Sequence, residues 1–248
     1  MPAAQSQTFH SLTNQFLDSV LALEPRAVAF DCDGTLWSGD AGERFFDWTL
    51  RTDGSSPDVL GHGVTSQGMR DRHAAYRRGE IDEATMCGEM TTMYRGISDQ
   101  KMLRAAEIFF EQFFVKQIFP EMRELVRRLQ ETGAEIWAVS SSNEWAIRAA
   151  MKYFAIPPSH ILAAKVELEG DIATDRLIRV PSGAGKTSAL REVAKKEMDA
   201  AFGNSRWDIE MLTAAKHAFA VNPNPDLEAL ARTNGWQIYF PEGIRSRN

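Results

Sequence analysis

Short apolar segments that end in polar turns recur along this 248-residue chain and alternate with segments of helical periodicity. The first spans residues 27–31 (AVAFD), and the turn sequence that follows it favours a strand over a buried helix. Later segments of this kind span residues 135–140, 198–203, 217–221 and 237–240. Strands that alternate with helices predict an α/β fold with a mainly parallel sheet and helices on both faces.

Two stretches depart from that alternation. Residues 162–180 alternate between apolar and polar around Gly170-Asp171, which predicts a hairpin. Residues 37–117 are mostly helical in pattern, with Met and Phe stripes that indicate a packed core. We therefore expect a helical domain at 37–117, inserted after the first strand of a core made of residues 1–36 and 118–248.

Composition excludes several classes of protein. The formal net charge of −6 argues against a nucleic-acid partner, because counterion release requires a basic face. The N-terminal segment lacks the basic start and apolar run of a signal peptide, and no stretch reaches the ~20 apolar residues of a membrane span. With only two cysteines, a cytoplasmic protein without a membrane partner is predicted. Oligomeric state stays open.

Two carboxylates follow the first predicted strand. Asp31 and Asp33 occupy alternate positions, so they can project from one face at the carboxyl end, where open α/β sheets bind ligands. Repulsion between close carboxylates raises the proton affinity of one. One acid can then act as nucleophile or metal ligand while the other acts as general acid. The alternative is an ordinary surface turn, since Asp and Gly are common turn residues.

The segment AVAFDCDGTL resembles the first motif of the haloacid dehalogenase-like phosphohydrolases, and three further segments follow in the order typical of that superfamily. EIWAVSSS resembles the second motif and points to Ser140, whereas GAGKTSAL resembles the third and points to Lys186. AFGNSRWDIEML resembles the fourth motif. The nearest branch is that of the phosphoserine phosphatases. The resemblance implies a Rossmann-like core, with residues 37–117 forming an all-helical cap.

The resemblance also implies a Mg²⁺-dependent phosphatase that forms an aspartyl-phosphate. Asp31 would be the nucleophile, and Asp33 would protonate the leaving group and then activate water. Ser140 would donate a hydrogen bond to a phosphoryl oxygen, and Lys186 would contribute a point charge. Which of the three serines at 140–142 faces the phosphate stays open, with Ser141 the second candidate. At least one of the three is expected to cap the helix that follows.

The fourth motif departs from the pattern of the family. Relatives carry Gly-Asp where this chain has Gly203-Asn204, and Asp208 is the next carboxylate. The implied Mg²⁺ ligands are therefore Asp31, the Asp33 backbone carbonyl, and either Asn204 or Asp208. We expect weaker metal binding than in a relative with aspartate at this position.

The substrate is left open by the sequence. Asp40 and Glu43 follow the first motif and are candidate substrate-binding acids, and Arg70, Arg72, Arg77 and Arg78 are candidates for a carboxylate clamp. The expected substrate is a phosphoserine-like metabolite. The alternatives are another small phosphoester such as phosphocholine or a sugar phosphate, a phosphomutase reaction, and a non-catalytic binding module with the same fold.

Overall fold

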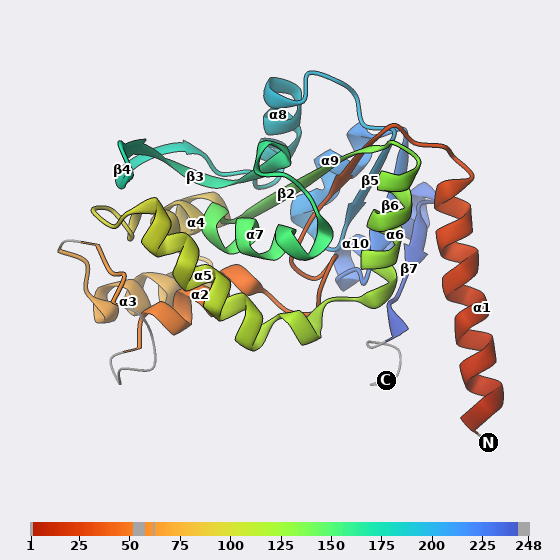
Figure 1. The fold of residues 1–248 in the computed structure, drawn as a ribbon, viewed down its shortest axis with the longest axis horizontal. Helices are drawn as coiled ribbons and strands as arrows, with labels where there is room; N and C mark the ends of the chain where they lie inside the picture. The colour runs from red at the N-terminus through yellow and green to blue at the C-terminus, as the bar shows by residue number, and fades with distance from the viewer. Residues whose placement is uncertain (1, 52–57, 62, 243–248) are drawn as a thin grey trace.

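A seven-stranded sheet forms the centre of the protein, in the order β4-β3-β2-β1-β5-β6-β7 (Figure 1). The computed structural model describes residues 2–51, 58–61 and 63–242, and for residues 2–11 it describes the backbone only. The strands are β1 (Ala27–Phe30), β2 (Glu135–Asn143), β3 (Ile161–Glu169), β4 (Ile172–Arg179), β5 (Ala200–Gly203), β6 (His217–Val221) and β7 (Gln237–Tyr239). Neighbouring strands are parallel except for β3 and β4, which form the predicted antiparallel hairpin.

Helices cover both faces of this sheet, and the alternation of side chains along β1 shows why. Val28 and Phe30 join the larger apolar cluster, together with residues of α1 (Pro2–Leu21), α6 (Pro120–Glu131) and α7 (Glu144–Met151). Ala27 and Ala29 join a second cluster, with residues of α8 (Ala184–Val193), α9 (Ile209–Ala214) and α10 (Pro225–Asn234). Because successive strand residues point to opposite faces, a short apolar strand needs cover on both sides. The predicted mainly parallel α/β fold is confirmed.

Between β1 and α6, the described residues form four α-helices: α2 (Ala41–Thr49), α3 (Ser66–Arg77), α4 (Glu83–Thr92) and α5 (Asp99–Phe113). Each of these helices begins after a residue whose side chain accepts a hydrogen bond from a backbone N–H of the first turn; these N-caps are Asp40, Thr65, Asp82 and Ser98. Short 3₁₀ turns span Val115–Gln117, Lys152–Phe154, Pro158–His160 and Arg206–Asp208. The all-helical insert after the first strand is thus confirmed.

The β3–β4 hairpin touches this insert at the connection between α4 and α5. The Gly96 N–H donates to the Ala173 carbonyl (2.7 Å), and the Ala173 N–H donates to the Ile97 carbonyl (2.9 Å). The Asp99 N–H donates to the Asp171 carbonyl (2.7 Å). The insert is therefore attached to the core by backbone hydrogen bonds as well as by its two chain connections. Among the helices of the described residues, none is both long and apolar enough to cross a membrane.

Candidate active site

The carboxyl edge of the sheet opens into a cavity of about 450 Å³, walled on one side by strand ends and on the other by the helical insert. Eight of the nine site residues predicted from the sequence line it: Asp31, Asp33, Asp40, Glu43, Ser140, Ser141, Lys186 and Asn204. The ninth, Asp208, is completely buried and is not part of the lining. The cavity lies where ligands bind in open α/β sheets.

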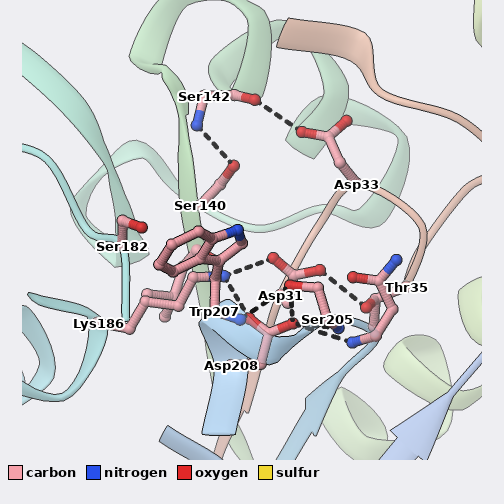
Figure 2. Close-up of polar contacts among 12 residues, drawn as sticks. Asp31, Asp33, Thr35, Ser140, Ser142, Ser182, Lys186, Ser205, Trp207 and Asp208 are labelled. Atoms are coloured by element: carbon pink, nitrogen blue, oxygen red, sulfur yellow. Dashed lines mark hydrogen bonds and ion pairs between the residues drawn. The ribbon is translucent and has the colours of Figure 1, made fainter. Parts of the chain in front are cut away.

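Asp31 stands at the end of β1, with its backbone N–H still donating to the Phe202 carbonyl (2.9 Å). Each of its carboxylate oxygens accepts one side-chain hydrogen bond. Oδ1 accepts from Lys186 Nζ (2.6 Å), and Oδ2 accepts from Thr35 Oγ1 (2.8 Å). These two donors fix the orientation of the carboxylate, which Figure 2 shows pointing toward Lys186 and Thr35.

Lys186 lies in the first turn of α8 and is only 2 % exposed. Its ammonium donates to Asp31 Oδ1, to Asp208 Oδ1 (2.5 Å) and to the Val139 carbonyl (3.3 Å). Burial alone lowers the pKa of this lysine, but the carboxylates of Asp208 and Asp31 outweigh burial and raise the pKa above its usual range. Lys186 is therefore a permanent cation at the floor of the cavity, not a solvated surface lysine.

One carboxylate oxygen of Asp208 accepts from Lys186, and the other accepts hydrogen bonds within its own loop. Oδ2 accepts from the backbone N–H groups of Asn204 (3.0 Å) and Ser205 (2.9 Å) and from Ser205 Oγ (3.2 Å). A Cβ atom on Gly203 would lie 2.5 Å from the Asp208 Cβ, so the loop requires glycine there. Both oxygens of Asp208 are thus occupied by protein donors.

Asp33 is held separately, facing the insert. Its Oδ1 accepts from Trp37 Nε1 (2.8 Å) and from the Ala41 N–H at the start of α2 (2.6 Å). Its Oδ2 accepts from Ser142 Oγ (2.7 Å) (Figure 2). Burial raises the pKa of Asp33, and the three hydrogen bonds only partly oppose it.

The charges around Asp31 also perturb its titration. Burial, followed by the neighbouring Asp208 carboxylate, raises the pKa of Asp31 to about 7, although Lys186 pulls in the opposite direction. Both acids of the first motif therefore hold protons more tightly than an exposed aspartate does. Strongly perturbed acids that line a cavity are typical of a functional site.

The three serines at the end of β2 have different surroundings. Ser140 and Ser142 are buried, with the Ser142 N–H donating to Ser140 Oγ (3.1 Å), whereas Ser141 is half-buried. The expectation that one of them caps the next helix is wrong. β2 continues to Asn143, and the Asn143 side chain accepts from the Ala146 N–H (3.0 Å) as the N-cap of α7. All three serines line the cavity.

Asn204 faces the turn that follows β1. Gly34 has a positive φ of 79°, and a Cβ atom on it would lie 1.8 Å from Asn204 Nδ2. Within the described residues, the side-chain amide of Asn204 has no hydrogen-bonding partner. It lines the cavity beside the two acids of the first motif.

The residues present fit a magnesium ion with mostly water and phosphate ligands. No group of three His, Cys, Asp or Glu side chains suited to a metal occurs in the part of the chain that the structure describes. Mg²⁺, however, is commonly held by one or two carboxylates, with water and substrate phosphate completing its octahedron. The side chains of Asp31 and Asn204 offer oxygen atoms at one edge of the cavity, so the donor set is compatible with this cation.

The wall formed by the insert contains residues that were not predicted from the sequence. Glu83, the first residue of α4, lines the cavity. His73 and Tyr76 of α3 also line it. The sequence pattern does not distinguish Ser142 from its two neighbours, although Ser142 is the serine that donates to Asp33. No motif marked Glu83, because its position depends on how α4 packs over the sheet.

Asp40 and Glu43 were predicted as substrate-binding acids. Asp40 is exposed at the rim, where its Oδ1 accepts from the Glu43 N–H (2.7 Å) as the N-cap of α2. Glu43 Oε1 lies 3.0 Å from His73 Nε2. Both carboxylates belong to the cavity, and both already have a protein partner.

The proposed arginine clamp does not line the cavity. Arg70 donates to the Leu50 carbonyl, Arg72 pairs with Glu89, and Arg78 pairs with Glu80. Arg77 is exposed at the end of α3 and is not part of the lining either. Lys186 is the one lysine or arginine that lines the cavity among the residues that the structure describes.

Comparison with known proteins agrees with this geometry. Residues 28–213 match the model of the haloacid dehalogenase-like hydrolase family. Phosphoserine phosphatase SerB1 of Mycobacterium tuberculosis is 26 % identical over 220 residues, covering 86 % of this chain and 70 % of that protein. A histidinol-phosphatase of Neisseria meningitidis is 24 % identical, covering 84 % of this chain and 96 % of the relative.

The fold is similar to that of solved structures. A protein of unknown function from Bordetella pertussis superimposes with a TM-score of 0.73 at 21 % identity, covering 86 % of this chain and 98 % of the other. The chain belongs to the haloacid dehalogenase-like hydrolase family, in its phosphoserine phosphatase-like branch, and is an enzyme of the phosphatase class.

Proposed function

We propose that this protein is a Mg²⁺-dependent phosphomonoesterase that hydrolyses a small phosphorylated metabolite through an aspartyl-phosphate on Asp31. The observation that carries the proposal is that the two acids of one cavity are held in place by different residues. Asp31 is oriented by Lys186 and Thr35, whereas Asp33 is held apart by Ser142 and the start of α2. A nucleophile and a proton donor need this kind of separate positioning.

In the first step, a carboxylate oxygen of Asp31 attacks phosphorus, and the bond from phosphorus to the ester oxygen breaks. Asp33 gives its proton to the departing alkoxide, and the raised pKa of Asp33 supports its being protonated at that moment. In the second step, a water molecule attacks the phosphoryl group while Asp33 takes up a proton. The phosphorus–oxygen bond to Asp31 breaks, and inorganic phosphate and free Asp31 result.

Charge on the phosphoryl group is balanced by this chain's own residues together with the cation. Lys186 is the fixed positive charge beside Asp31, and Ser140, within β2, is the proposed hydrogen-bond donor to a phosphoryl oxygen. Asn204 lines the cavity, whereas Asp208 is completely buried and does not line it. Asn204 is therefore the proposed fourth-motif ligand, alongside Asp31 and the Asp33 backbone carbonyl. When bound there, Mg²⁺ supplies Lewis-acid stabilisation of the transferring phosphoryl group.

The relatives support a small phosphomonoester as the substrate class, since their names specify phosphoserine and histidinol phosphate. We place the catalytic core at residues 1–36 and 118–248 and the cap at 37–117, the boundaries at which the chain enters and leaves the helical insert. Both cysteines are free and buried, which supports the proposed cytoplasmic location.

The direct test is hydrolysis of 4-nitrophenyl phosphate by the purified protein with and without Mg²⁺, followed by a screen of phosphorylated metabolites. Release of inorganic phosphate that requires Mg²⁺ is the expected result. Asp31→Asn is the blank for contaminating phosphatases. An inert wild-type protein across the whole screen would favour a non-catalytic binding module instead.

Replacing Asn204 by aspartate is expected to lower the Mg²⁺ concentration for half-maximal activity by about tenfold, because a charged oxygen ligand replaces a neutral one. The measurement is a Mg²⁺ titration of activity at fixed substrate. Asn234→Asp, an exposed substitution in α10, adds the same charge away from the cavity and is the matched control. Equal Mg²⁺ requirements in wild type and Asn204→Asp would contradict Asn204 as a ligand.

The rate is expected to fall with pH below about 7 when Mg²⁺ is limiting. The pKa of Asp31 is raised to about 7, so below that pH it is protonated and can neither attack phosphorus nor bind a cation. One essential deprotonation makes kcat/KM fall toward tenfold per pH unit on the acid side. Saturating Mg²⁺ competes with the proton for Asp31 and is expected to move the acid-side fall of kcat/KM to lower pH. An acid-side fall at the same pH in low and high Mg²⁺ would contradict Asp31 as the group that must be deprotonated.

A further inference from the structure

The charges of the cavity are distributed unevenly between its two ends. The strand-end side holds Lys186 beside Asp31, which suits a phosphoryl group. The side formed by the insert and its entrance holds three further carboxylates, those of Asp40, Glu43 and Glu83. The organic part of a bound phosphomonoester must face this acidic side.

In the described part of the chain, no cation on this side of the cavity is free to bind a carboxylate. Among the residues that the structure describes, the basic groups lining the cavity are Lys186 and His73. Lys186 is held by Asp31 and Asp208 at the opposite end, and His73 is already in contact with Glu43. A substrate carboxylate placed under the insert would therefore meet negative charge without a counter-ion, which selects against it.

Glu83 is the most enclosed of the three acids on this side. It is the first residue of α4 and is only 7 % exposed, and its Oε1 accepts from Ser182 Oγ (2.9 Å) in the segment before α8. Burial raises the pKa of Glu83, and the hydroxyls of Ser182 and Ser141 partly oppose this effect. Within the described residues, no lysine, arginine or histidine forms an ion pair with Glu83.

The rest of the α4 wall is apolar. Cys87 and Met90 line the cavity one and two turns after Glu83, so one face of the helix presents a single acid followed by a thiol and a thioether. Residues four and seven positions apart share a helix face. This surface fits a short hydrocarbon chain that ends in one cationic group.

We propose that the substrate is the phosphomonoester of a short amino alcohol without a carboxylate, and that Glu83 binds its ammonium group. This inference rests on the proposed function and narrows it. It predicts a lower kcat/KM for phosphoserine than for the same phosphoester without the carboxylate. Glu83 then sets specificity, and the chemistry remains with Asp31 and Asp33.

Three probes that differ by one group at a time test the inference on the wild-type protein: O-phosphoethanolamine, propyl phosphate and O-phosphoserine. Propyl phosphate replaces the ammonium by a methyl group, and phosphoserine adds a carboxylate. We expect kcat/KM for phosphoethanolamine to exceed that for propyl phosphate by about 10- to 100-fold, the range for one hydrogen bond to a charged group. It should also exceed the value for phosphoserine, whose carboxylate meets the acidic side of the cavity without a counter-ion. Phosphoserine turned over as well as phosphoethanolamine would overturn the inference without any variant.

Glu83→Gln then tests the residue. The ratio of kcat/KM for phosphoethanolamine to that for propyl phosphate is expected to fall by about 10- to 100-fold. Glu89→Gln is the matched control, since Glu89 lies on the same helix but pairs with Arg72 outside the cavity, and its ratio should equal that of the wild type. An unchanged ratio in Glu83→Gln would reject Glu83 as the determinant.

The two proposals fail in different ways. Activity toward 4-nitrophenyl phosphate without a preference for the ammonium substrate would overturn the specificity inference alone. Inactivity toward 4-nitrophenyl phosphate and all three probes in the presence of Mg²⁺ would overturn the proposed function, and this inference with it.

Discussion

Asp31→Asn is expected to lower kcat by about 10⁴-fold or more, because an amide cannot form the covalent intermediate on which the two-step reaction depends. The substitution preserves the volume of the side chain and keeps an oxygen for the hydrogen bond from Lys186 or Thr35. The measurement is phosphate release under single-substrate steady-state conditions with saturating Mg²⁺.

Asp175→Asn is the control for this prediction, since Asp175 is an exposed residue of β4 that is not part of the cavity lining. Its kcat should match that of the wild type. Retention of more than about a hundredth of the activity in Asp31→Asn would show that another group attacks phosphorus.

Lys186→Met is expected to destabilise the protein by about 3–5 kcal/mol, because removing one partner of a buried ion pair leaves uncompensated charge. Here the removed ammonium faces two carboxylates, Asp31 and Asp208, both buried. Urea denaturation at pH 8 measures the loss. Lys216→Met, which breaks an exposed pair with Asp199, should change the midpoint little.

The pH dependence of the Lys186→Met variant has a defined sign. A carboxyl group whose pKa is higher in the folded than in the unfolded protein binds more protons when folded, so its contribution to stability increases as pH falls. The pKa of Asp31 is already raised to about 7 with Lys186 present, against an ordinary value of 3.8. The urea midpoint of the variant should therefore rise between pH 8 and pH 6. A midpoint that falls over this range would contradict the buried-carboxylate account.

Much of the architecture could be predicted because it depends on local patterns. The strand at 217–221 matches β6, and the hairpin around Gly170-Asp171 matches β3 and β4. The end of β2 was predicted too early, at 140. Ser141 and Ser142 are expected to lead into the following helix, but the structure continues the strand to Asn143. Tertiary packing of these serines into the site overrides their local preference for helix N-caps.

The candidate site was only partly predictable, for a related reason. Asp31, Asp33 and Lys186 belong to short motifs whose strand and helix contexts place them at one sheet edge. Glu83 lies about fifty residues from the nearest motif aspartate and has no local signature. Only the docking of α4 over the cavity brings Glu83 into its lining.

Local order along the chain was sufficient to establish the parallel sheet, the helical insert and the two acids of the first motif, because each follows from residue periodicity or from neighbours a few positions away. The burial of Asp208 away from the cavity, the partner of Asp33 and the acidic wall around Glu83 required the folded molecule. These features depend on distances between segments far apart in the chain, and packing sets those distances.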